Sequence, residues 1–460
     1  MMRLSLSEVA RITGGRLHGA DRAVAGVCTD TRQPAPEALF VALRGPRFDA
    51  HRFVDPELPA AALLVEHPVS SPLPRVEVDD TRRALADLAA AWRQRCTARV
   101  VALTGSNGKT TVKEMLAAIL RTAGSVLSTH GNLNNELGVP LTLLSLSPED
   151  RFAVIEMGAN HPGEIAGLTA LAAPDVALIT NAGPAHLEGF GSVEAVARAK
   201  GEIFQGLGPD GVAVLNADDP HAGYWAGLNT ERRVMRFGLR PGVEVSGEVD
   251  PRGHLFITTG GGAVTVALPL AGAHNHGNAL AATAVALALG VDLAAVKSGL
   301  EAMSPVPGRL VTRDGRDGVR LIDDSYNANP ASVRAAIDVL ARESGRRFLV
   351  LGDMGELGEA GPALHAAVGR DAVARGLDGL WATGPLSRHA VEAFGPGGRH
   401  FPDRQALVAA LQDELKVGDA VLVKGSRSQH METVVHALLA PVPGEHNKHS
   451  GEDGHAAHSV

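Results

Sequence analysis

The residues best suited to chemistry are the glycines, lysine and threonines of the segment TGSNGKTT, which spans residues 104–111. Gly105 and Gly108 would let backbone N–H groups come close to phosphate oxygens, and Lys109 would add a positive charge. Thr110 or Thr111 could hold a magnesium ion through its hydroxyl. We therefore predict a nucleotide-phosphate site made of Thr104, Gly105, Ser106, Asn107, Gly108, Lys109, Thr110 and Thr111.

A strand, a tight turn and a helix must position these residues. Residues 100–104 are mostly apolar, as in a buried strand, and apolar residues at helical spacing run from Val112 to Leu120. A helix that opens at the turn would add its positive end to the site. The segment departs from the usual pattern because Leu103 stands where the first glycine is expected. The alternative is an ordinary strand-to-helix turn with a surface lysine.

Length and composition are those of an ordinary globular enzyme with several domains. At 460 residues the chain is too long for one core, and the usual domain size suggests about three. The formal net charge is −8, from 43 Lys and Arg against 51 Asp and Glu, so we expect no nucleic-acid partner. We expect no membrane span, because every apolar run is shorter than roughly 18 residues. Cys28 and Cys96 lack metal or disulfide spacing, which favours a reduced, cytoplasmic setting.

The sequence predicts an α/β fold with three domains and a disordered tail. Residues 1–98 form a small first domain that opens with an amphipathic helix in MMRLSLSEVARITGG. Strand and helix patterns alternate over residues 99–306, which indicates a mostly parallel sheet with helices on both faces. After the Pro-rich joint at 304–309, residues 307–442 repeat this alternation and predict a second doubly wound sheet. Residues 443–460 are polar and rich in His and Gly, so we expect disorder.

Polar side chains follow several strands of the second domain. Glu156 ends a buried strand, where a carboxylate is costly unless it is paired or bound to a metal. His186 lies in a Gly-rich segment after the next strand, where an ordinary loop histidine is the alternative. A hard cation that bridges phosphates would suit both residues. Lys200 lies on a predicted helix and would ordinarily be a solvated residue.

The first domain carries an unusual density of Asp, Thr, Arg and His over residues 28–54. Four polar residues stand together near its start and could bind a ligand. On their chemistry alone, a polar turn is the slightly better explanation. The four residues are Thr29, Asp30, Thr31 and Arg32.

Further candidates lie around the joint between the second and third domains. Asn275 and Asn278 precede or begin a helix of small residues, so they could cap it or contact a base. Arg309 follows the Pro-rich joint. Asp323 and Asn327 end the first strand of the third domain, where turn and cap roles are the alternative to ligand contact.

In order and approximate spacing, these motifs resemble those of the Mur ligases, the ATP-dependent amide-forming enzymes of peptidoglycan synthesis. The resemblance rests on TGSNGKTT, the Glu156 segment, NAGPAHLEGFGSVEAVARAKGEIF, GAHNHGN and the Pro-Gly-Arg joint, and it covers nearly all of residues 25–435. Within the family, IDDSYNANP and LGDMGELG resemble the branch that adds D-alanyl-D-alanine. The Asp-Asn-Pro-Arg motif of many diaminopimelate-adding relatives is absent.

The resemblance implies a domain for a UDP-sugar, a central ATPase domain and a C-terminal Rossmann-like domain for the incoming amine. It implies an enzyme that joins D-Ala-D-Ala to UDP-MurNAc-tripeptide through an acyl phosphate, using ATP and two magnesium ions. We expect this enzyme to be a cytoplasmic monomer. Residues 29–32 then become better candidates for substrate binding than for a turn alone.

The resemblance also assigns roles to individual residues. Lys109, His186 and Lys200 would be catalytic, and Lys200 would be carbamylated. Magnesium would be held by Thr110, Glu156, His186 and Lys200, and the nucleotide would lie near Asn275, Arg309, Asp323 and Asn327.

Two other functions compete with this prediction. One is a different amide ligase of the superfamily, such as the diaminopimelate- or lysine-adding member or a folylpolyglutamate-type ligase. The segments DSYNANP and DMGELG disfavour it. The other is a nucleotide-gated switch with slow ATPase activity, which leaves the polar first domain unexplained.

Overall fold

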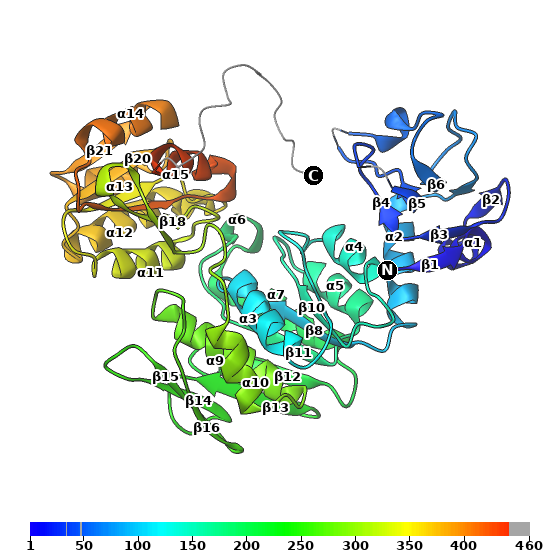
Figure 1. The fold of residues 1–460 in the computed structure, drawn as a ribbon, viewed down its shortest axis with the longest axis horizontal. Helices are drawn as coiled ribbons and strands as arrows, with labels where there is room; N and C mark the ends of the chain where they lie inside the picture. Colours follow the sequence, from blue (N-terminus) through cyan, green and yellow to red (C-terminus); the bar gives the residue numbers. More distant parts are fainter. Residues whose placement is uncertain (34, 47, 441–460) are drawn as a thin grey trace. The chain divides into compact units, whose positions relative to one another are not determined.

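The structure of the chain is a computed structural model that describes residues 1–33, 35–46 and 48–440 (Figure 1). These residues divide into two units. The first comprises Met1–Val306 together with Glu356–Glu359, and the second comprises Pro307–Gly355 and the described residues from Ala360 onward. The boundary between the first and second predicted domains stays a prediction. The predicted tail, residues 443–460, lies outside the described residues.

The first part of unit 1 is built on a five-stranded sheet in the order β2-β7-β6-β5-β4. Three of its strand pairs are parallel and the β2–β7 pair is antiparallel. The strands are β2 (Arg16–His18), β4 (Val27–Cys28), β5 (Ala35–Val41), β6 (Ala60–Val65) and β7 (Arg75–Glu77), and β1 (Arg3–Ser5) and β3 (Ala23–Ala25) form a separate pair.

The N-terminal helix is shorter than the sequence predicts. Met2 and Leu4 are buried while Arg3 between them is exposed, which is the alternation of a strand, and this segment pairs with β3. Ser5 then starts α1 (Leu6–Thr13) with a capping box, because its hydroxyl accepts the N–H of Glu8 and its own N–H donates to the Glu8 carboxylate. The expectation of a helix from the first residues is therefore wrong.

The centre of unit 1 is a nine-stranded sheet in the order β16-β15-β14-β13-β12-β11-β8-β10-β9 (Figure 1). The pairs from β9 to β14 are parallel, and β14, β15 and β16 are antiparallel neighbours. The predicted strand over residues 100–104 and the predicted, mostly parallel sheet are confirmed. The strands are β8 (Arg99–Thr104), β9 (Val126–Ser128), β10 (Phe152–Glu156), β11 (Val176–Ile179), β12 (Val212–Asn216), β13 (Arg233–Gly238), β14 (Val245–Val249), β15 (Leu255–Thr259) and β16 (Gly262–Val266).

Helices cover both faces of this sheet, as predicted. Successive residues of a strand point to opposite faces. Val100 and Ala102 of β8 pack in one apolar cluster with α4 and α5, and Val101 and Leu103 pack in another with α3, α9 and α10. The helices of unit 1 after α1 are α2 (Thr81–Arg93), α3 (Lys109–Arg121), α4 (Gly138–Leu144), α5 (Glu164–Ala172), α6 (Leu187–Phe190), α7 (Val193–Gly201), α8 (Ala222–Gly227), α9 (His274–Ala288) and α10 (Leu293–Glu301).

Unit 2 contains a six-stranded sheet in the order β17-β18-β22-β19-β20-β21. All of its strand pairs are parallel except the one between β17 and β18, so the predicted second doubly wound sheet is confirmed. Its strands are β17 (Val311–Asp314), β18 (Arg320–Asp324), β19 (Arg347–Leu351), β20 (Gly379–Thr383), β21 (Gly398–Phe401) and β22 (Ala420–Lys424). Its helices are α11 (Pro330–Leu340), α12 (Gly361–Ala374), α13 (Arg388–Phe394), α14 (Arg404–Glu414) and α15 (Glu432–Leu438).

Gly299 offers a test of the packing between α10 and α3. A Cβ atom at this position would lie 2.4 Å from the Cα atom of Ile119, and backbone cannot move aside cheaply. We expect Gly299→Ala to lower the free energy of unfolding by about 1–3 kcal/mol in denaturant titrations. Gly167 in α5 is the matched control because nothing lies within 4 Å of its Cβ position. Gly167→Ala should raise the stability by about 0.5–1 kcal/mol, and equal effects would contradict the packing account.

Candidate functional site

The predicted phosphate loop connects β8 to α3 and has no room for side chains at its glycines. A Cβ atom on Gly105 would lie 1.8 Å from Thr180 Oγ1, and one on Gly108 would lie 2.4 Å from Asn278 Oδ1. Gly108 also has a φ of 82°, which favours glycine. Lys109 opens α3, and its ammonium folds back to donate to the Gly105 carbonyl at 2.7 Å. The loop therefore has the close backbone approach and the positive charge that a phosphate group requires.

The segment after β11 holds this loop in place. The N–H of Ser106 donates to the Asn181 carbonyl at 3.0 Å, and the N–H of Asn107 donates to the Asn181 side chain at 3.0 Å. Thr180 Oγ1 donates to the Asn107 carbonyl at 2.7 Å. These bonds form because β8 and β11 are parallel neighbours whose carboxyl ends meet at one edge of the sheet. Sequence reasoning missed Asn181, whose only signal was its place in a polar segment after a strand.

Asn275 and Asn278 lie within the first turns of α9, and both are buried. Asn278 Nδ2 donates to Asn275 Oδ1 at 2.9 Å, and Asn275 Nδ2 donates to the Ala271 carbonyl at 2.6 Å. The helix is capped at Ala273 without a side-chain bond, so the capping explanation is wrong for both residues. Asn278 instead packs beside Gly108 of the phosphate loop. A contact of either residue with the base stays a prediction.

Glu156 ends β10 with a carboxylate that is only partly satisfied. The residue is 2% exposed, and its Oε1 accepts a bond from Asn134 Nδ2 at 2.8 Å. Its Oε2 is buried and has no hydrogen-bond partner among the described residues. A buried carboxylate oxygen without a partner is costly, and a cation would remove that cost. An oxygen donor of this kind is what Mg²⁺ prefers, so Glu156 fits a magnesium ligand.

Lys200 is buried in α7 with 3% exposure, so the expectation of a solvated lysine is wrong. Burial lowers its pKa well below the usual lysine value, and the positive charge of Lys109 lowers this pKa further. The structure thus brings Lys109 and Lys200, which lie on different helices, within electrostatic reach of each other. This environment therefore favours the uncharged amine more than the surroundings of a solvated lysine do.

His186 precedes α6 in the left-handed conformation, with a φ of 54°. Its Nδ1 lies against the carboxylate of Glu356, which belongs to the same unit. The bond from His186 lowers the pKa of the Glu356 carboxyl. The structure therefore shows a structural partner for His186, and its role as a metal ligand stays a prediction.

The remaining nucleotide candidates all belong to unit 2. Asp323 Oδ1 accepts bonds from the N–H and the hydroxyl of Ser325, and Asn327 Oδ1 accepts the N–H of Ala328 at 2.8 Å. The Arg309 guanidinium lies 4.3 Å from the centre of the Tyr326 ring. The turn roles of Asp323 and Asn327 are thus observed, and their contact with a nucleotide stays a prediction.

A buried ion pair that sequence reasoning missed lies beside these residues. Lys424 at the end of β22 donates to Asp324 at 2.5 Å and to the Asn327 carbonyl at 2.8 Å. Both charged residues are buried, which raises the pKa of Asp324 and lowers the pKa of Lys424. Because β18 and β22 are parallel neighbours, the pair fixes the loop that follows β18.

Residues 29–32 form a polar turn in the first sheet region. The Arg32 side chain is 82% exposed and donates to the Asp30 carboxylate at 2.7 Å. Its backbone N–H also donates to Asp30 Oδ1 at 3.0 Å. The bond from the Arg32 guanidinium lowers the pKa of Asp30. Binding of a UDP-sugar by this turn stays a prediction.

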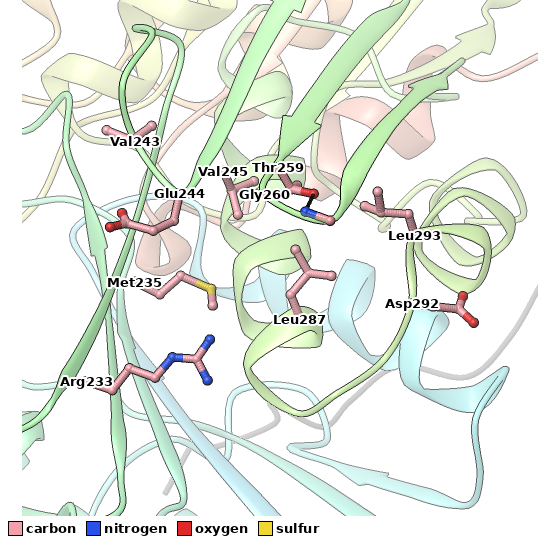
Figure 2. A pocket seen from close by; sticks show the side chains of 11 residues that line it. Arg233, Met235, Val243, Glu244, Val245, Thr259, Gly260, Leu287, Asp292 and Leu293 are labelled. Carbon is pink, nitrogen blue, oxygen red and sulfur yellow. Dashed lines mark hydrogen bonds between the residues drawn. The ribbon is translucent and has the colours of Figure 1, made fainter.

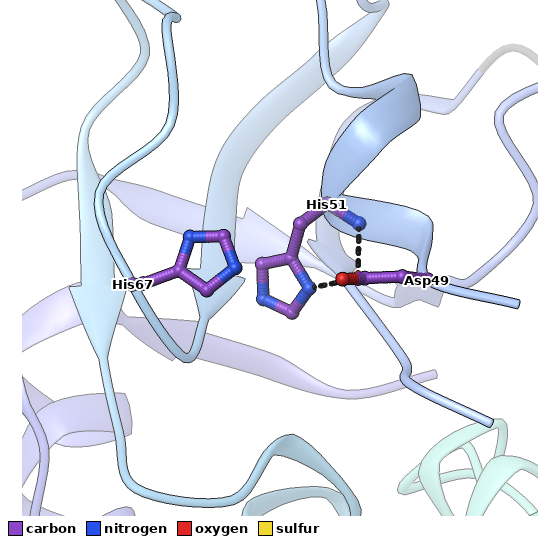
Figure 3. A group of neighbouring side chains, drawn as sticks. All are labelled: Asp49, His51 and His67. Atoms are coloured by element: carbon purple, nitrogen blue, oxygen red, sulfur yellow. Dashed lines mark hydrogen bonds and ion pairs between the residues drawn. The ribbon is translucent and has the colours of Figure 1, made fainter. Parts of the chain in front are cut away.

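Asp49, His51 and His67 form a cluster whose possible ligand atoms lie within 4.8 Å of one another (Figure 3). His51 Nε2 accepts the N–H of Glu66 at 2.9 Å, so the proton of the neutral ring lies on Nδ1. That nitrogen lies 2.7 Å from Asp49 Oδ1 and donates to it. The rings of His51 and His67 stack with centres 4.4 Å apart. Both nitrogens of His51 have partners. The cluster is therefore better explained as a support for the turn at residues 49–53 than as a metal site.

A cavity of about 750 Å³ is lined by residues of β13, β14 and β15 of the central sheet and by Leu287 of α9 (Figure 2). Met235, Val245 and Leu287 contribute apolar side chains to it. Leu287 lies 12 residues beyond Asn275 on α9, which corresponds to about 18 Å along the helix. Asp292 at its rim already caps α10 by accepting the N–H of Ala295 at 2.8 Å. The predicted site residues are absent from its lining, so the cavity does not explain them.

Comparison with known proteins identifies the family. Residues 103–286 match the Mur ligase middle domain, and residues 308–427 match the Mur ligase glutamate ligase domain. The chain is 48% identical over 449 residues to the UDP-N-acetylmuramoyl-tripeptide--D-alanyl-D-alanine ligase of Escherichia coli (strain K12), covering 95% of this chain and 99% of that relative. The chain belongs to the Mur ligase family.

Solved structures place this Mur ligase within the MurF branch. A crystal structure of MurF from Acinetobacter baumannii superposes with a TM-score of 0.88 at 37% identity, covering 95% of this chain and 98% of that one. MurF from Thermotoga maritima in complex with ADP gives a TM-score of 0.79 at 31% identity, covering 90% and 97%. The expected fold class of the Mur ligases is confirmed. Within the described ranges, no helix of this Mur ligase has the length and apolar character to span a membrane.

The close approach at Gly105 gives a test of the phosphate loop. In Gly105→Ala the new methyl group would collide with Thr180 Oγ1, so we expect ADP affinity to fall by about tenfold or more in calorimetric titrations. Thr180→Ala alone serves as the control. The double variant removes the colliding oxygen and should recover part of the lost affinity. If it binds ADP no better than Gly105→Ala while remaining folded, the steric account is wrong.

Proposed function

We propose that this Mur ligase is a cytoplasmic enzyme that joins D-alanyl-D-alanine to UDP-MurNAc-tripeptide and converts ATP to ADP and phosphate. The observation that carries the proposal is the 48% identity to the Escherichia coli ligase over 95% of the chain, because it spans both the phosphate loop and the second sheet. The product is UDP-MurNAc-pentapeptide. Cys28 and Cys96 are both free, which is compatible with a reduced compartment.

The first step joins two anions. The terminal carboxylate of the tripeptide attacks the γ-phosphate of ATP, forming an acyl phosphate and releasing ADP. Repulsion between the two reactants is the main obstacle, so the site must neutralise charge and hold the groups in line. Lys109 and the positive N-terminal end of α3, which begins at Lys109, provide fixed positive charge for this purpose. In the second step the amine of D-Ala-D-Ala attacks the activated carbonyl, an amide bond forms and phosphate leaves.

Magnesium would be held by Glu156, with Thr110, His186 and a modified Lys200 as further ligands. The buried, unsatisfied Oε2 of Glu156 supports this assignment, since it needs a positively charged partner. When bound, the metal would neutralise phosphate charge. Asn134 donates to Glu156 Oε1, so Oε2 is the oxygen that would hold the metal.

The modification proposed for Lys200 is a carbamate. An uncharged amine can attack CO₂, and loss of one proton then leaves an N-carboxylate, which is an oxygen ligand for magnesium. The lowered pKa of Lys200 supports this step because it increases the uncharged fraction near neutral pH. A protonated lysine at the same position would repel the metal.

The central experiment detects the product. ATP, UDP-MurNAc-tripeptide and D-Ala-D-Ala are incubated with the enzyme, and UDP-MurNAc-pentapeptide is identified by its mass. Parallel reactions with single amino acids test for a different amide ligase of the superfamily. Release of ADP without any amide product would favour the nucleotide-gated switch instead.

Lys109→Ala tests the role of the loop lysine. Removing a preorganised positive charge should cost on the order of 3 kcal/mol in the activation free energy, measured as kcat/KM for ligation. The thermal stability of the variant should be close to that of the wild type, because Lys109 is only partly buried. Near-normal ligation by Lys109→Ala would refute the role.

Lys200→Ala tests the carbamate. The variant should lose most ligation activity and regain part of it when a short carboxylate such as acetate is added, because the small anion can replace the missing oxygen ligand. Lys109→Ala, assayed under the same conditions, should show no rescue. An unimpaired Lys200→Ala enzyme would remove Lys200 from the site altogether.

A further inference from the structure

Lys113 is a buried charged residue that the proposed mechanism does not use. It lies on α3 one helical turn beyond Lys109 and is 2% exposed. Its ammonium donates to the Thr129 carbonyl at 2.6 Å and lies 2.9 Å from the Glu114 carboxylate. Burying an ammonium group is costly unless its bonds serve the structure or the site. The Glu114 carboxylate balances the charge of Lys113. The hydrogen bond from Lys113 to Thr129 is therefore the feature that needs an explanation.

Thr129 connects this lysine to Glu156. The residue is 1% exposed and directly follows β9, whose last paired residue is Ser128. The register between β9 and β10 ends at Ser128 and Val154, and the N–H of Glu156 donates to the Thr129 hydroxyl at 2.9 Å. Thr129 therefore holds the backbone of the residue whose Oε2 is left unsatisfied.

The segment that follows β9, residues 129–134, also holds the Glu156 side chain. Asn134, five residues after Thr129, donates to Glu156 Oε1 at 2.8 Å, and its carbonyl accepts the N–H of Gly158 at 2.8 Å. Thr129, at one end of this segment, thus fixes the backbone of Glu156, and Asn134, at the other end, fixes its carboxylate. Lys113 anchors the first of these ends to α3, the helix that opens at the phosphate loop.

We propose that Lys113 and Thr129 are positioning residues that orient Glu156 toward a divalent cation. This inference rests on the proposed function only in assigning the cation to the nucleotide site. The route from α3 through Thr129 to Glu156 couples the helix that carries Lys109 to the carboxylate of the neighbouring strand. Partners of metal ligands typically change metal affinity by about 10- to 100-fold when they are removed.

The test compares two substitutions of Thr129, one that removes the side-chain hydroxyl and one that keeps it. Thr129→Val keeps the shape of the side chain but removes the hydroxyl, whereas Thr129→Ser keeps the hydroxyl. Mn²⁺ is titrated against each protein with a saturating non-hydrolysable ATP analogue, and free Mn²⁺ is measured by electron paramagnetic resonance. We expect about tenfold weaker Mn²⁺ binding for Thr129→Val and near wild-type binding for Thr129→Ser. Lys113→Met should weaken binding in the same direction, and the double variant should add little to Thr129→Val.

Thr283→Val is the matched control. Thr283 is a buried threonine of the same unit whose hydroxyl donates to the Ala279 carbonyl within α9, so its loss should leave Mn²⁺ affinity unchanged. Thermal melts without metal verify that each variant is folded, and if Thr129→Val is unfolded, Lys113→Met takes its place in the comparison. Equal Mn²⁺ affinity of the folded variants and the wild type would overturn the inference, as would equal losses in Thr129→Val and Thr129→Ser.

The outcome is independent of the ligase assay. If the wild type forms no pentapeptide but Thr129→Val binds Mn²⁺ more weakly than Thr129→Ser, the proposed function fails and the positioning role holds. If the wild type forms pentapeptide and the variants bind Mn²⁺ equally, the function holds and the positioning role fails. Absence of Mn²⁺ binding by the wild type with the analogue would overturn the positioning role together with the metal assignment.

Discussion

Burial of charge at the carboxyl edge of the central sheet is the constraint on which the first unit depends. Glu156, Lys113 and Lys200 are all nearly inaccessible to water. Each of them would destabilise the fold if it had no compensation. Lys113 has a carbonyl and a carboxylate, Lys200 has a lowered pKa, and Glu156 keeps one oxygen unsatisfied. A cation bound at the unsatisfied Oε2 of Glu156 would therefore stabilise this edge of the sheet.

The parallel arrangement of the strands explains why these groups meet. In a parallel sheet every strand ends at the same edge, so the loops after β8, β10 and β11 are neighbours although they are far apart in the chain. The hydrogen bonds from Asn107 and Ser106 to Asn181 show how tightly two of these loops are joined. The same topology recurs in unit 2, where Lys424 at the end of one strand binds Asp324 at the end of its neighbour.

Part of the site could be predicted from local pattern. Around residues 99–122, apolar residues follow the spacing of a strand and then of a helix, and glycines mark the turn between them. This part of the site therefore follows from neighbouring residues alone. The start of the N-terminal helix does not follow from such a pattern, because a three-residue strand precedes it and the helix begins at the Ser5 capping box. The expectation of a solvated Lys200 is wrong, because helical spacing does not reveal what packs against that face of α7.

By itself, the sequence determined the fold class, the order of the main strands and helices, the glycine turn between β8 and α3 and the family motifs, since each of these is encoded by residues close together in the chain. Only the tertiary structure decided which loops are in contact. It showed that Asn181 binds the loop after β8, and that Asn134 and Thr129 bind Glu156. These contacts join strands separated by tens of residues, and only the pairing of the strands brings them together. The same pairing removes water from Lys200 and so lowers its pKa, which a linear sequence cannot show.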